Sequence, residues 1–379
     1  MERKYDAETL AALRKEERTE NIFGTSVIVR GIPFEKRRGG MDPRWREHKY
    51  GGAGAVNNLT KPAFPAEIIQ LPAEQILLKI QSLMAGALDA KPRREEDAEF
   101  DVSCTWTTIA SGGREVGAYR YERRSGAKEG RCCVLLLHGG GWFMGKPVYN
   151  DLTARYIAQN ADALVFDVDY SLAPQNKFPA ALEDVWSVLE YVSEHAETLG
   201  IARNKIAVMG GSAGANLAAA LSLKDRDEGK EQLALQILQV PVVLLANIPV
   251  EGYSASEADF ELSDEVEKLL GKQEPMEKSA ALKLMVEGYV KHYPDDVHQP
   301  YLSPMLGELK GVAPALMHVA SLDSLWPQGV FYARRLREAG VYVRVIKYDG
   351  IEHETDGEVG VTPQAEDFLM EVCAALRAL

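Results

Sequence analysis

Four continuous apolar runs of strand length constrain the fold of this 379-residue chain most strongly. The runs lie at 132–138, 163–170, 205–210 and 234–243, and such runs are typical of strands buried on both faces of a sheet. Two further strands are expected at 314–321 and 342–348, and helical stretches occur at 179–198, 213–224, 327–339 and 363–378. The alternation predicts an α/β fold, with a mostly parallel central sheet flanked by helices.

The chain before these runs contains one expected hairpin and a less regular beginning. The segments "SCTWTTIA" and "GAYRYERR" flank Ser111-Gly112-Gly113, which predicts two antiparallel strands. The first hundred residues contain helix-like stretches at 7–20 and 73–88. We therefore expect an N-terminal helical and cap region over 1–100 and an α/β domain over 101–379.

A charged segment at about 247–303 interrupts the alternation between two expected strands, and it contains an expected helix at 275–293. Ligands of open α/β sheets bind beyond the carboxyl ends of the strands, and this segment follows one such end. We expect it to be a cap insertion that forms a lid together with residues 1–100. Surface decoration is the alternative for both segments.

Composition argues against several classes of protein. The net formal charge of −13 argues against nucleic acid as a partner. No stretch reaches the roughly 18 uninterrupted apolar residues of a membrane span, and the charged N-terminal segment lacks the apolar core of a signal peptide. The four cysteines, Cys104, Cys132, Cys133 and Cys373, show no CxxC spacing, so we expect neither a metal site nor a disulfide framework. A cytoplasmic protein is the expectation.

The motif with the clearest chemistry is Gly210-x-Ser212-x-Gly214, within "VMGGSAGANLAAAL". It directly follows an expected strand and directly precedes a helix rich in small residues. This context is the one that a nucleophile elbow requires, with the serine on a tight strand-to-helix turn. The two glycines leave space for neighbouring backbone, and the helix N-terminus directs amide donors toward negative charge near Ser212. Ser212 is therefore the candidate nucleophile.

Three consecutive glycines after the first buried strand, in "LLLHGGGWFMG", fit the same chemistry. Ordered glycines are costly, at roughly 0.5–1 kcal/mol each relative to Ala. Acyl transfer at Ser212 creates an oxyanion, which needs backbone N–H donors that no side chain obstructs. We expect Gly140 and Gly141 to be donors, Gly139 to shape the approach, and Ala213, the residue after the serine, to supply the third N–H. A plain glycine-rich turn is the alternative.

A nucleophilic serine needs a base, and in this type of site the base follows the serine and the acid in the chain. His353 alone among the histidines lies after Ser212 in a loop beyond the last expected strand. His292 and His298 fall in the expected cap, and His318 falls in mid-strand, where a core or hydrogen-bonded histidine is expected. His353 is the candidate base. His138, which precedes the glycines, is expected to anchor their loop through hydrogen bonds.

The orienting acid has two candidates. Asp323 follows the expected strand 314–321 at its carboxyl end, where catalytic loops gather in this type of sheet. Asp349 lies closer to His353 in sequence but at the end of a strand. We favour Asp323, which would accept a hydrogen bond from Nδ1 of His353 and leave Nε2 facing Ser212.

Taken together, these motifs resemble the hormone-sensitive-lipase-like family of α/β-hydrolases. The matching segments, in the family's order, are "HGGGW" (138–142), "DYSLAP" (169–174), "GGSAGANLA" (210–218), "YLSP" (301–304), "ASLDSL" (320–325), "RRLREAGV" (334–341) and "YDGIEH" (348–353). The resemblance covers about residues 100–379 and is weak before them. It implies an α/β-hydrolase catalytic domain with a cap, and ester hydrolysis without a cofactor or a metal.

Some positions depart from the family's pattern, and others are expected to lie near the base or the substrate pocket. Ser171 and Gln175 stand where the family commonly has Arg and Glu, so a structural ion pair is not expected there. The carboxylates Glu352 and Glu354, on either side of the candidate base, are expected to be solvated. The aromatic residues Trp142 and Tyr149 follow the glycine run and are expected to line the substrate pocket, with core packing an equal alternative for Tyr149.

The leading hypothesis is a serine carboxylesterase that cleaves small-molecule esters of small to medium acyl chain through an acyl-enzyme. An arylformamidase or amidase is one alternative, because arylformamidases share the HGGG and GxSxG pattern. A non-catalytic ligand receptor on the same scaffold is another. The family's plant hormone receptors have lost the catalytic histidine, and the presence of His353 here favours an enzyme. The first hundred residues are expected either to cap the pocket or to form a homodimer interface.

Overall fold

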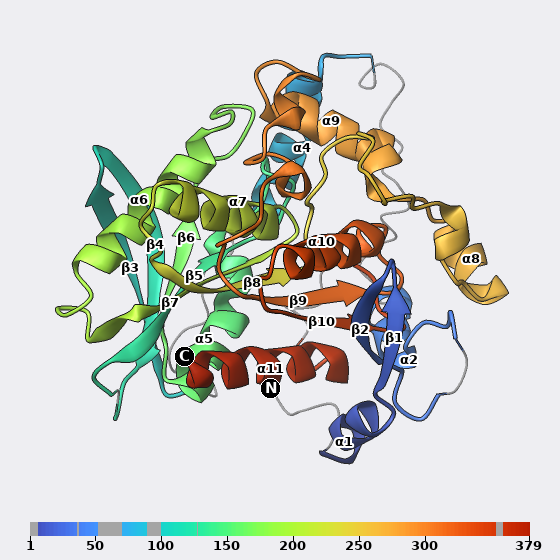
Figure 1. Cartoon of the computed structure of the whole chain (residues 1–379), viewed down its shortest axis with the longest axis horizontal. Helices are drawn as coiled ribbons and strands as arrows, with labels where there is room; N and C mark the ends of the chain where they lie inside the picture. Colours follow the sequence, from blue (N-terminus) through green and yellow to red (C-terminus); the bar gives the residue numbers. More distant parts are fainter. Residues whose placement is uncertain (1–6, 36–37, 52–69, 89–99, 127, 354–358) are drawn as a thin grey trace.

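A single mixed sheet organises the protein, as seen in a computed structural model that describes residues 7–35, 38–51, 70–88, 100–126, 128–353 and 359–379 (Figure 1). Its strands are β1 (Arg18–Ile22), β2 (Thr25–Arg30), β3 (Val102–Ser111), β4 (Arg114–Arg123), β5 (Arg131–Leu137), β6 (Leu164–Asp169), β7 (Ile201–Gly211), β8 (Leu233–Gln239), β9 (Ala315–Ala320) and β10 (Val343–Tyr348). They lie in the order β1-β2-β10-β9-β8-β7-β5-β6-β4-β3. From β2 through β6 in this order all neighbours are parallel, and the outer pairs are antiparallel.

Helices cover both faces of the sheet. The helices of the described residues are α1 (Ala7–Lys15), α2 (Pro43–Tyr50), α4 (Ala73–Leu88), α5 (Asp151–Ala161), α6 (Ala180–Glu194), α7 (Ala213–Asp227), α8 (Asp264–Leu270), α9 (Ala280–Tyr289), α10 (Trp326–Glu338) and α11 (Pro363–Ala378). Helices α5 and α11 pack together on one face, while α6, α7 and α10 share the core of the other. The predicted α/β class with a mostly parallel sheet is confirmed.

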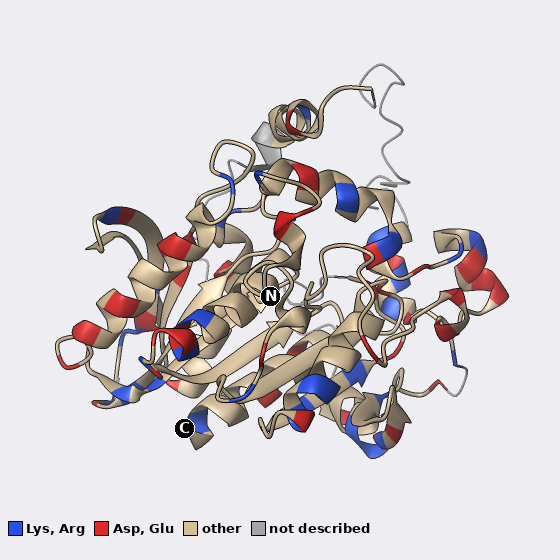
Figure 2. Ribbon diagram, turned by 45° about the horizontal axis from the view of Figure 1, so that its top comes forward, with Lys and Arg blue, Asp and Glu red and all other residues tan. Residues whose placement is uncertain are grey.

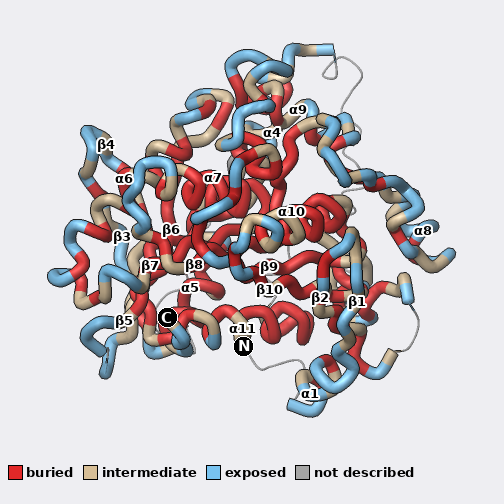
Figure 3. The backbone as a smooth tube through the Cα atoms, viewed as in Figure 1, coloured by how far each residue is buried: buried red, intermediate tan, exposed pale blue. Residues whose placement is uncertain are grey.

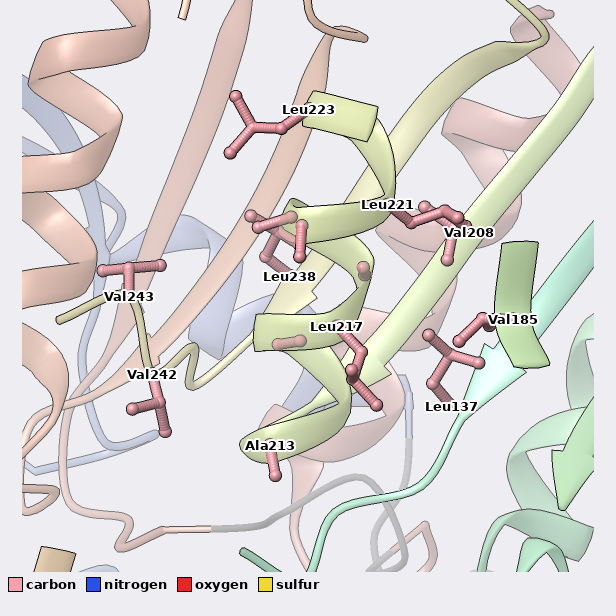
Figure 4. Close-up of a cluster of buried hydrophobic side chains, with 14 of the residues drawn as sticks. Leu137, Val185, Val208, Ala213, Leu217, Leu221, Leu223, Leu238, Val242 and Val243 are labelled. Atoms are coloured by element: carbon pink, nitrogen blue, oxygen red, sulfur yellow. The ribbon is translucent and has the colours of Figure 1, made fainter. Parts of the chain in front are cut away.

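The four apolar runs and the two further expected strands form the buried strands of the sheet, because helices cover both of its faces. Along β5 every residue after Arg131 is buried, because both faces of the sheet are covered (Figure 3). On one face the apolar side chains of α7 point toward the strands, with Leu217 and Leu221 near Leu137 and Val208 (Figure 4). Each such buried leucine contributes about 1.5–3 kcal/mol relative to exposure. The charged residues lie mostly on the outer helices and loops, with both signs interspersed (Figure 2).

One strand is shorter than predicted. The apolar run at 234–243 continues past Gln239, where β8 ends. Val240 adopts a positive φ of 41° and Pro241 follows it, so the ladder with β9 cannot continue regularly. The chain leaves the sheet at this point and runs toward the insertion.

The N-terminal region contributes two strands that sequence analysis did not predict. Strand β2 pairs in parallel with β10, and β1 returns beside it as the outermost strand. The strand β1, "RTENI", is short and polar, and the turn between the two strands is Phe23-Gly24 rather than a sequence typical of tight hairpins. Residues 18–30 therefore extend the central sheet, while the division into domains stays a prediction.

The two segments expected to form a cap contact each other. Helix α4 comes from the N-terminal region and α9 from the insertion, and the two pack together. They approach so closely that a Cβ on Gly288 would lie 2.2 Å from Cδ1 of Leu77. Their role as a lid stays a prediction. Among the residues that the structure describes, no helix combines the length and the apolarity needed to cross a bilayer.

His318 is a core residue, as expected, but it is not hydrogen-bonded. It lies in the middle of β9 with an exposure of 1%, between the rings of Tyr348 and Phe368. In the described part of the chain neither ring nitrogen has a hydrogen-bond partner. Burial, and secondarily the charge of His353, lower the pKa of His318 to about 3.

This buried histidine predicts a pH dependence of stability. In the unfolded chain a histidine has a pKa near 6.5, so below that pH the unfolded state binds more protons and the folded state loses about 1.4 kcal/mol per pH unit. The variant His318→Leu should therefore lose about 2 kcal/mol less free energy of unfolding than wild type between about pH 6.5 and pH 5. Urea unfolding at several pH values measures this. The exposed His195, changed to Gln, is the control and should keep the wild-type slope, and equal slopes for His318→Leu and wild type would contradict the prediction.

Candidate active site

Ser212 occupies the turn between β7 and α7. Its φ of 55° and ψ of −116° are unusual for a residue with a side chain. The turn is held from two sides, because the N–H of Ser212 donates to the carbonyl of Gln239 at 2.9 Å and its carbonyl accepts from the N–H of Asn216 at 3.0 Å. Such backbone strain persists only where the surroundings fix it, and it is common at functional sites.

The glycines of the GxSxG motif are required by close backbone approach. A Cβ on Gly210 would lie 2.3 Å from the carbonyl oxygen of Gly214. A Cβ on Gly214 would lie 2.2 Å from the carbonyl oxygen of Leu137, at the end of β5. The turn therefore packs directly against the strand that leads into the glycine run.

The structure brings Ser212, His353 and Asp323 together. Nε2 of His353 lies 2.9 Å from Oγ of Ser212, and Nδ1 lies 2.9 Å from Oδ2 of Asp323. The other carboxylate oxygen of Asp323 accepts from the N–H of Leu325 at 3.0 Å, which fixes the carboxylate. With Nδ1–H donating to Asp323, Nε2 is left to accept the hydroxyl proton of Ser212. Ser212 and Asp323 are nearly buried, with exposures of 7% and 2%, and the His353 side chain is 32% exposed.

The competing acid, Asp349, has other partners. Its carboxylate lies 2.8 Å from the guanidinium of Arg18 and 3.8 Å from Nζ of Lys347. Arg18 belongs to β1, so the strand that sequence analysis missed holds this carboxylate. The hydrogen bond to His353 is made by Asp323.

The loops after β9 and β10 are joined by backbone hydrogen bonds. The N–H of Leu322 donates to the carbonyl of Ile351 at 3.0 Å, and the N–H of Gly350 donates to Oγ of Ser321 at 2.9 Å. Because β9 and β10 are parallel neighbours, both loops leave the sheet at the same edge. This pairing sets the distance between the candidate acid and the candidate base.

The glycine run adopts backbone conformations that side chains rarely permit. Gly140 and Gly141 have φ values of +117° and +60°. A Cβ on Gly140 would lie 2.2 Å from the carbonyl oxygen of Met144, and one on Gly141 would lie 2.5 Å from Sδ of Met285 on α9. The backbone of Met144 therefore requires glycine at position 140, the positive φ favours it at position 141, and Met285 of the insertion lies directly against the run. The oxyanion role of Gly139, Gly140, Gly141 and Ala213 stays a prediction.

His138 anchors the glycine run, as predicted. Its ring stacks on Tyr170 with centroids 4.2 Å apart, and Nδ1 lies 2.8 Å from the carbonyl oxygen of Gly139. Burial lowers the pKa of His138 to about 4, so the ring is neutral near pH 7. A neutral ring with an Nδ1–H can donate to the Gly139 carbonyl and hold the loop in place.

The two aromatic residues expected in the pocket differ in burial. Trp142 is 1% exposed and stacks on Tyr289 of α9, with ring centroids 4.9 Å apart and planes 6° apart. Tyr149 is 44% exposed. The Trp142 ring thus joins the glycine run to the insertion, and a pocket-lining role for either residue stays a prediction.

Gln175, one of the two departures from the family's pattern, pairs with a residue of α4. Nε2 of Gln175 donates to the side-chain oxygen of Gln81 on α4 at 2.9 Å. Gln81 also donates to the carbonyl oxygens of Phe143 and Ala173, at 2.6 and 2.9 Å. Helix α4 is thereby tied to the loop after the glycine run. Sequence analysis missed Gln81, since a glutamine on a helix carries no motif.

Glu352 is not solvated, contrary to expectation. Its carboxylate, 13% exposed, accepts hydrogen bonds from Trp45 and Tyr50 and pairs with Lys49, all on α2. The expectation failed because sequence alone did not show that α2 lies beside the loop of His353. Glu354 lies outside the described residues. No group of three or more potential metal ligands occurs within the described ranges.

Comparisons with known proteins agree with the α/β-hydrolase fold. A family model described as the α/β-hydrolase fold matches residues 134–356. Esterase LipI of Mycobacterium tuberculosis is 34% identical over 250 residues, which cover 65% of this chain and 72% of that protein. Ethyl acetate hydrolase of Pseudomonas putida is 32% identical over 297 residues, which cover 78% and 86%. The solved structure of EstE1, a thermostable carboxylesterase from a metagenomic library, superposes with a TM-score of 0.65 at 26% identity, covering 82% of this chain and 98% of EstE1.

The close approach of Gly140 to the backbone of Met144 predicts that a side chain at position 140 lowers activity. In Gly140→Ala the new Cβ would collide with a backbone carbonyl, so the loop must shift and its N–H groups move with it. We expect kcat for p-nitrophenyl acetate to fall by about 10²–10³-fold, as when one oxyanion donor is lost. Gly113→Ala is the control, because Gly113 also has a positive φ of +77° but nothing within 4 Å of an added Cβ. An unchanged kcat in Gly140→Ala, with Gly113→Ala also unchanged, would count against this role of the loop.

Proposed function

The chain belongs to the α/β-hydrolase fold family, in its hormone-sensitive-lipase-like branch, and is a carboxylic ester hydrolase; we propose that Ser212, His353 and Asp323 perform this reaction through an acyl-enzyme. The observation that carries the proposal is the unbroken chain of hydrogen bonds from Oγ of Ser212 through the imidazole to Asp323, with 2.9 Å at each step. A relay of this geometry activates a serine whose own hydroxyl is a weak nucleophile.

The proposed reaction has two halves. Nε2 of His353 takes the hydroxyl proton as Oγ of Ser212 attacks the ester carbonyl, and Asp323 stabilises the imidazolium that forms. The carbonyl oxygen becomes an oxyanion, which the N–H groups of Gly140, Gly141 and Ala213 stabilise. The imidazolium then gives its proton to the departing alcohol. Water repeats the cycle on the acyl-enzyme and releases the carboxylic acid.

An acyl group of small to medium length fits the surroundings of the glycine run. Met285 lies against Gly141, and Trp142 stacks on Tyr289, so apolar side chains of α9 stand next to the proposed oxyanion hole. Apolar walls with a few directed N–H donors favour an uncharged, compact ester. The relative whose name specifies ethyl acetate, an ester with a two-carbon acyl group, supports this preference.

Two further expectations belong to the proposal. None of the four cysteines, which all lie within the described ranges, forms a disulfide bond, and this supports the proposed cytoplasmic location. A homodimer built through the N-terminal region stays a proposal as well, and gel filtration with light scattering would test it.

The nucleophile can be tested directly. Ser212→Ala should reduce hydrolysis of p-nitrophenyl acetate by about 10⁶-fold, because loss of the nucleophile removes the acyl-enzyme route. Wild type should be labelled by an organophosphate on the peptide that contains Ser212, as mapped by peptide mass. Ser103→Ala, a change on the edge strand β3, is the control and should retain turnover. Label on another peptide, or undiminished turnover by Ser212→Ala, would remove Ser212 from the mechanism.

Substrate preference is tested with a panel of esters. We expect kcat/KM for p-nitrophenyl esters to be highest for acyl chains of about two to six carbons and to fall for longer chains, because compact apolar pockets bury short ligands best. The panel should include an N-formyl arylamine and an ester of matched size. Faster cleavage of the formamide would favour the arylformamidase alternative, and tight binding without turnover of any member would favour a receptor.

A further inference from the structure

The residue before the proposed base is held by a helix from the opposite end of the chain. Nε1 of Trp45 donates to the Glu352 carboxylate at 2.8 Å, the hydroxyl of Tyr50 donates at 2.9 Å, and Nζ of Lys49 pairs with it at 3.0 Å. All three donors lie on α2, about 300 residues earlier in the sequence. The carboxylate therefore points toward α2 rather than toward the imidazole of His353.

We propose that Glu352 is a positioning residue for His353, and that α2 is the element that holds it. This inference rests on the proposed function, because it assigns Glu352 a role in placing the proposed general base. Glu352 does not touch the reacting atoms, so its effect passes through the backbone that it shares with His353.

Helix α2 is anchored well enough to serve as a fixed support. Asp42 begins the helix, is fully buried, and accepts from the N–H of Arg44 at 2.9 Å and from Nε2 of Gln364 at 2.9 Å. The N–H of Asp42 donates to the carbonyl of Gly350 at 2.8 Å. The Trp45 ring is itself only 4% exposed. The helix thus attaches to α11 and to the loop of His353 at the same time.

The loop that carries His353 needs a support at this point. Residues 349–353 form no helix or strand. Their first part is tied down, since the N–H of Asp349 donates to the carbonyl of Arg30 at 2.9 Å and Ile351 accepts from Leu322 at 3.0 Å. The Glu352 side chain ties the residue directly before His353 to α2. A shift of about 1 Å in a catalytic group can cost about 10²-fold in rate, so this tie bears directly on kcat.

The charges and rings around the Glu352 carboxylate favour a persistent contact with α2. Nζ of Lys49 lies 5.3 Å from the ring centroid of Trp45 and 5.6 Å from that of Tyr50, so the two rings flank the ammonium group. Burial, and then the charge of Glu352, raise the pKa of Tyr50 far above its ordinary value, so its hydroxyl stays a donor. A carboxylate that is 13% exposed and bound by three donors is held more firmly than a surface ion pair.

The first test is a pair of substitutions at Glu352. Glu352→Ala removes the hydrogen bonds and the ion pair with α2. We expect kcat to fall by about 10–100-fold with little change in KM, because the pocket is intact and the base is misplaced. Glu352→Gln keeps an oxygen that accepts from Trp45 or Tyr50, so it should recover most of kcat. Rates are expressed per active site, counted by exhaustive organophosphate labelling, so that an unfolded fraction does not lower them.

Two further variants test whether the effect runs through α2. Trp45→Phe removes the indole donor and should lower kcat in the same direction, and Trp45→Phe combined with Glu352→Ala should be no slower than Glu352→Ala alone, since the pair acts as one unit. Glu265→Gln is the matched control. Glu265 of α8 pairs with Arg46 of α2, but both side chains are exposed, at 57% for Glu265 and 50% for Arg46. It should leave kcat unchanged.

Several results would overturn the inference. A wild-type kcat per active site in Glu352→Ala is one, and an effect on KM alone is another. Fully additive losses for Trp45→Phe and Glu352→Ala would mean that the two residues do not act together. Failure of the proposed function looks different, since wild type itself would then lack turnover, or Ser212→Ala would retain it.

Discussion

A hydrogen bond of 2.9 Å between Nε2 of His353 and Oγ of Ser212 joins residues that are 141 positions apart in the chain. It can form because β7, β9 and β10 belong to one parallel arrangement, so the loops that follow them leave the sheet at the same edge. Backbone hydrogen bonds between the loops after β9 and β10 then bring the Asp323 carboxylate to the other side of the imidazole. The proposed chemistry depends on this alignment being kept to within a fraction of an ångström.

The N-terminal region contributes to the site at three separate places. Strand β2 covers the free edge of β10, and Arg18 of β1 binds the carboxylate of Asp349. Helix α2 binds Glu352, next to the proposed base. Helix α4 reaches the loop after the glycine run through Gln81 and packs on α9 of the insertion. A segment with little sequence signal therefore supports both the proposed base and the surroundings of the proposed oxyanion hole.

Sequence reasoning succeeded where a pattern has a local physical cause. The buried strands follow from continuous apolar runs, and the turn at Ser212 follows from Gly210 and Gly214, whose Cβ positions are filled by backbone. It failed for β1, for β2 and for Glu352. The strand β1 is polar because it lies at the edge of the sheet, so it lacks the apolar run that marks a central strand. Glu352 resembles any surface glutamate until the position of α2 is known.

The sequence by itself determined the α/β class, the strand-to-helix turn at Ser212, the glycine run and the order of the candidate residues, because each of these depends on neighbours within a few positions. Only the tertiary structure decided that Asp323 rather than Asp349 contacts His353, that Met285 lies against Gly141, and that α2 binds Glu352. These contacts join distant segments. Their partners are chosen by strand order and by helix packing, which depend on the whole chain at once.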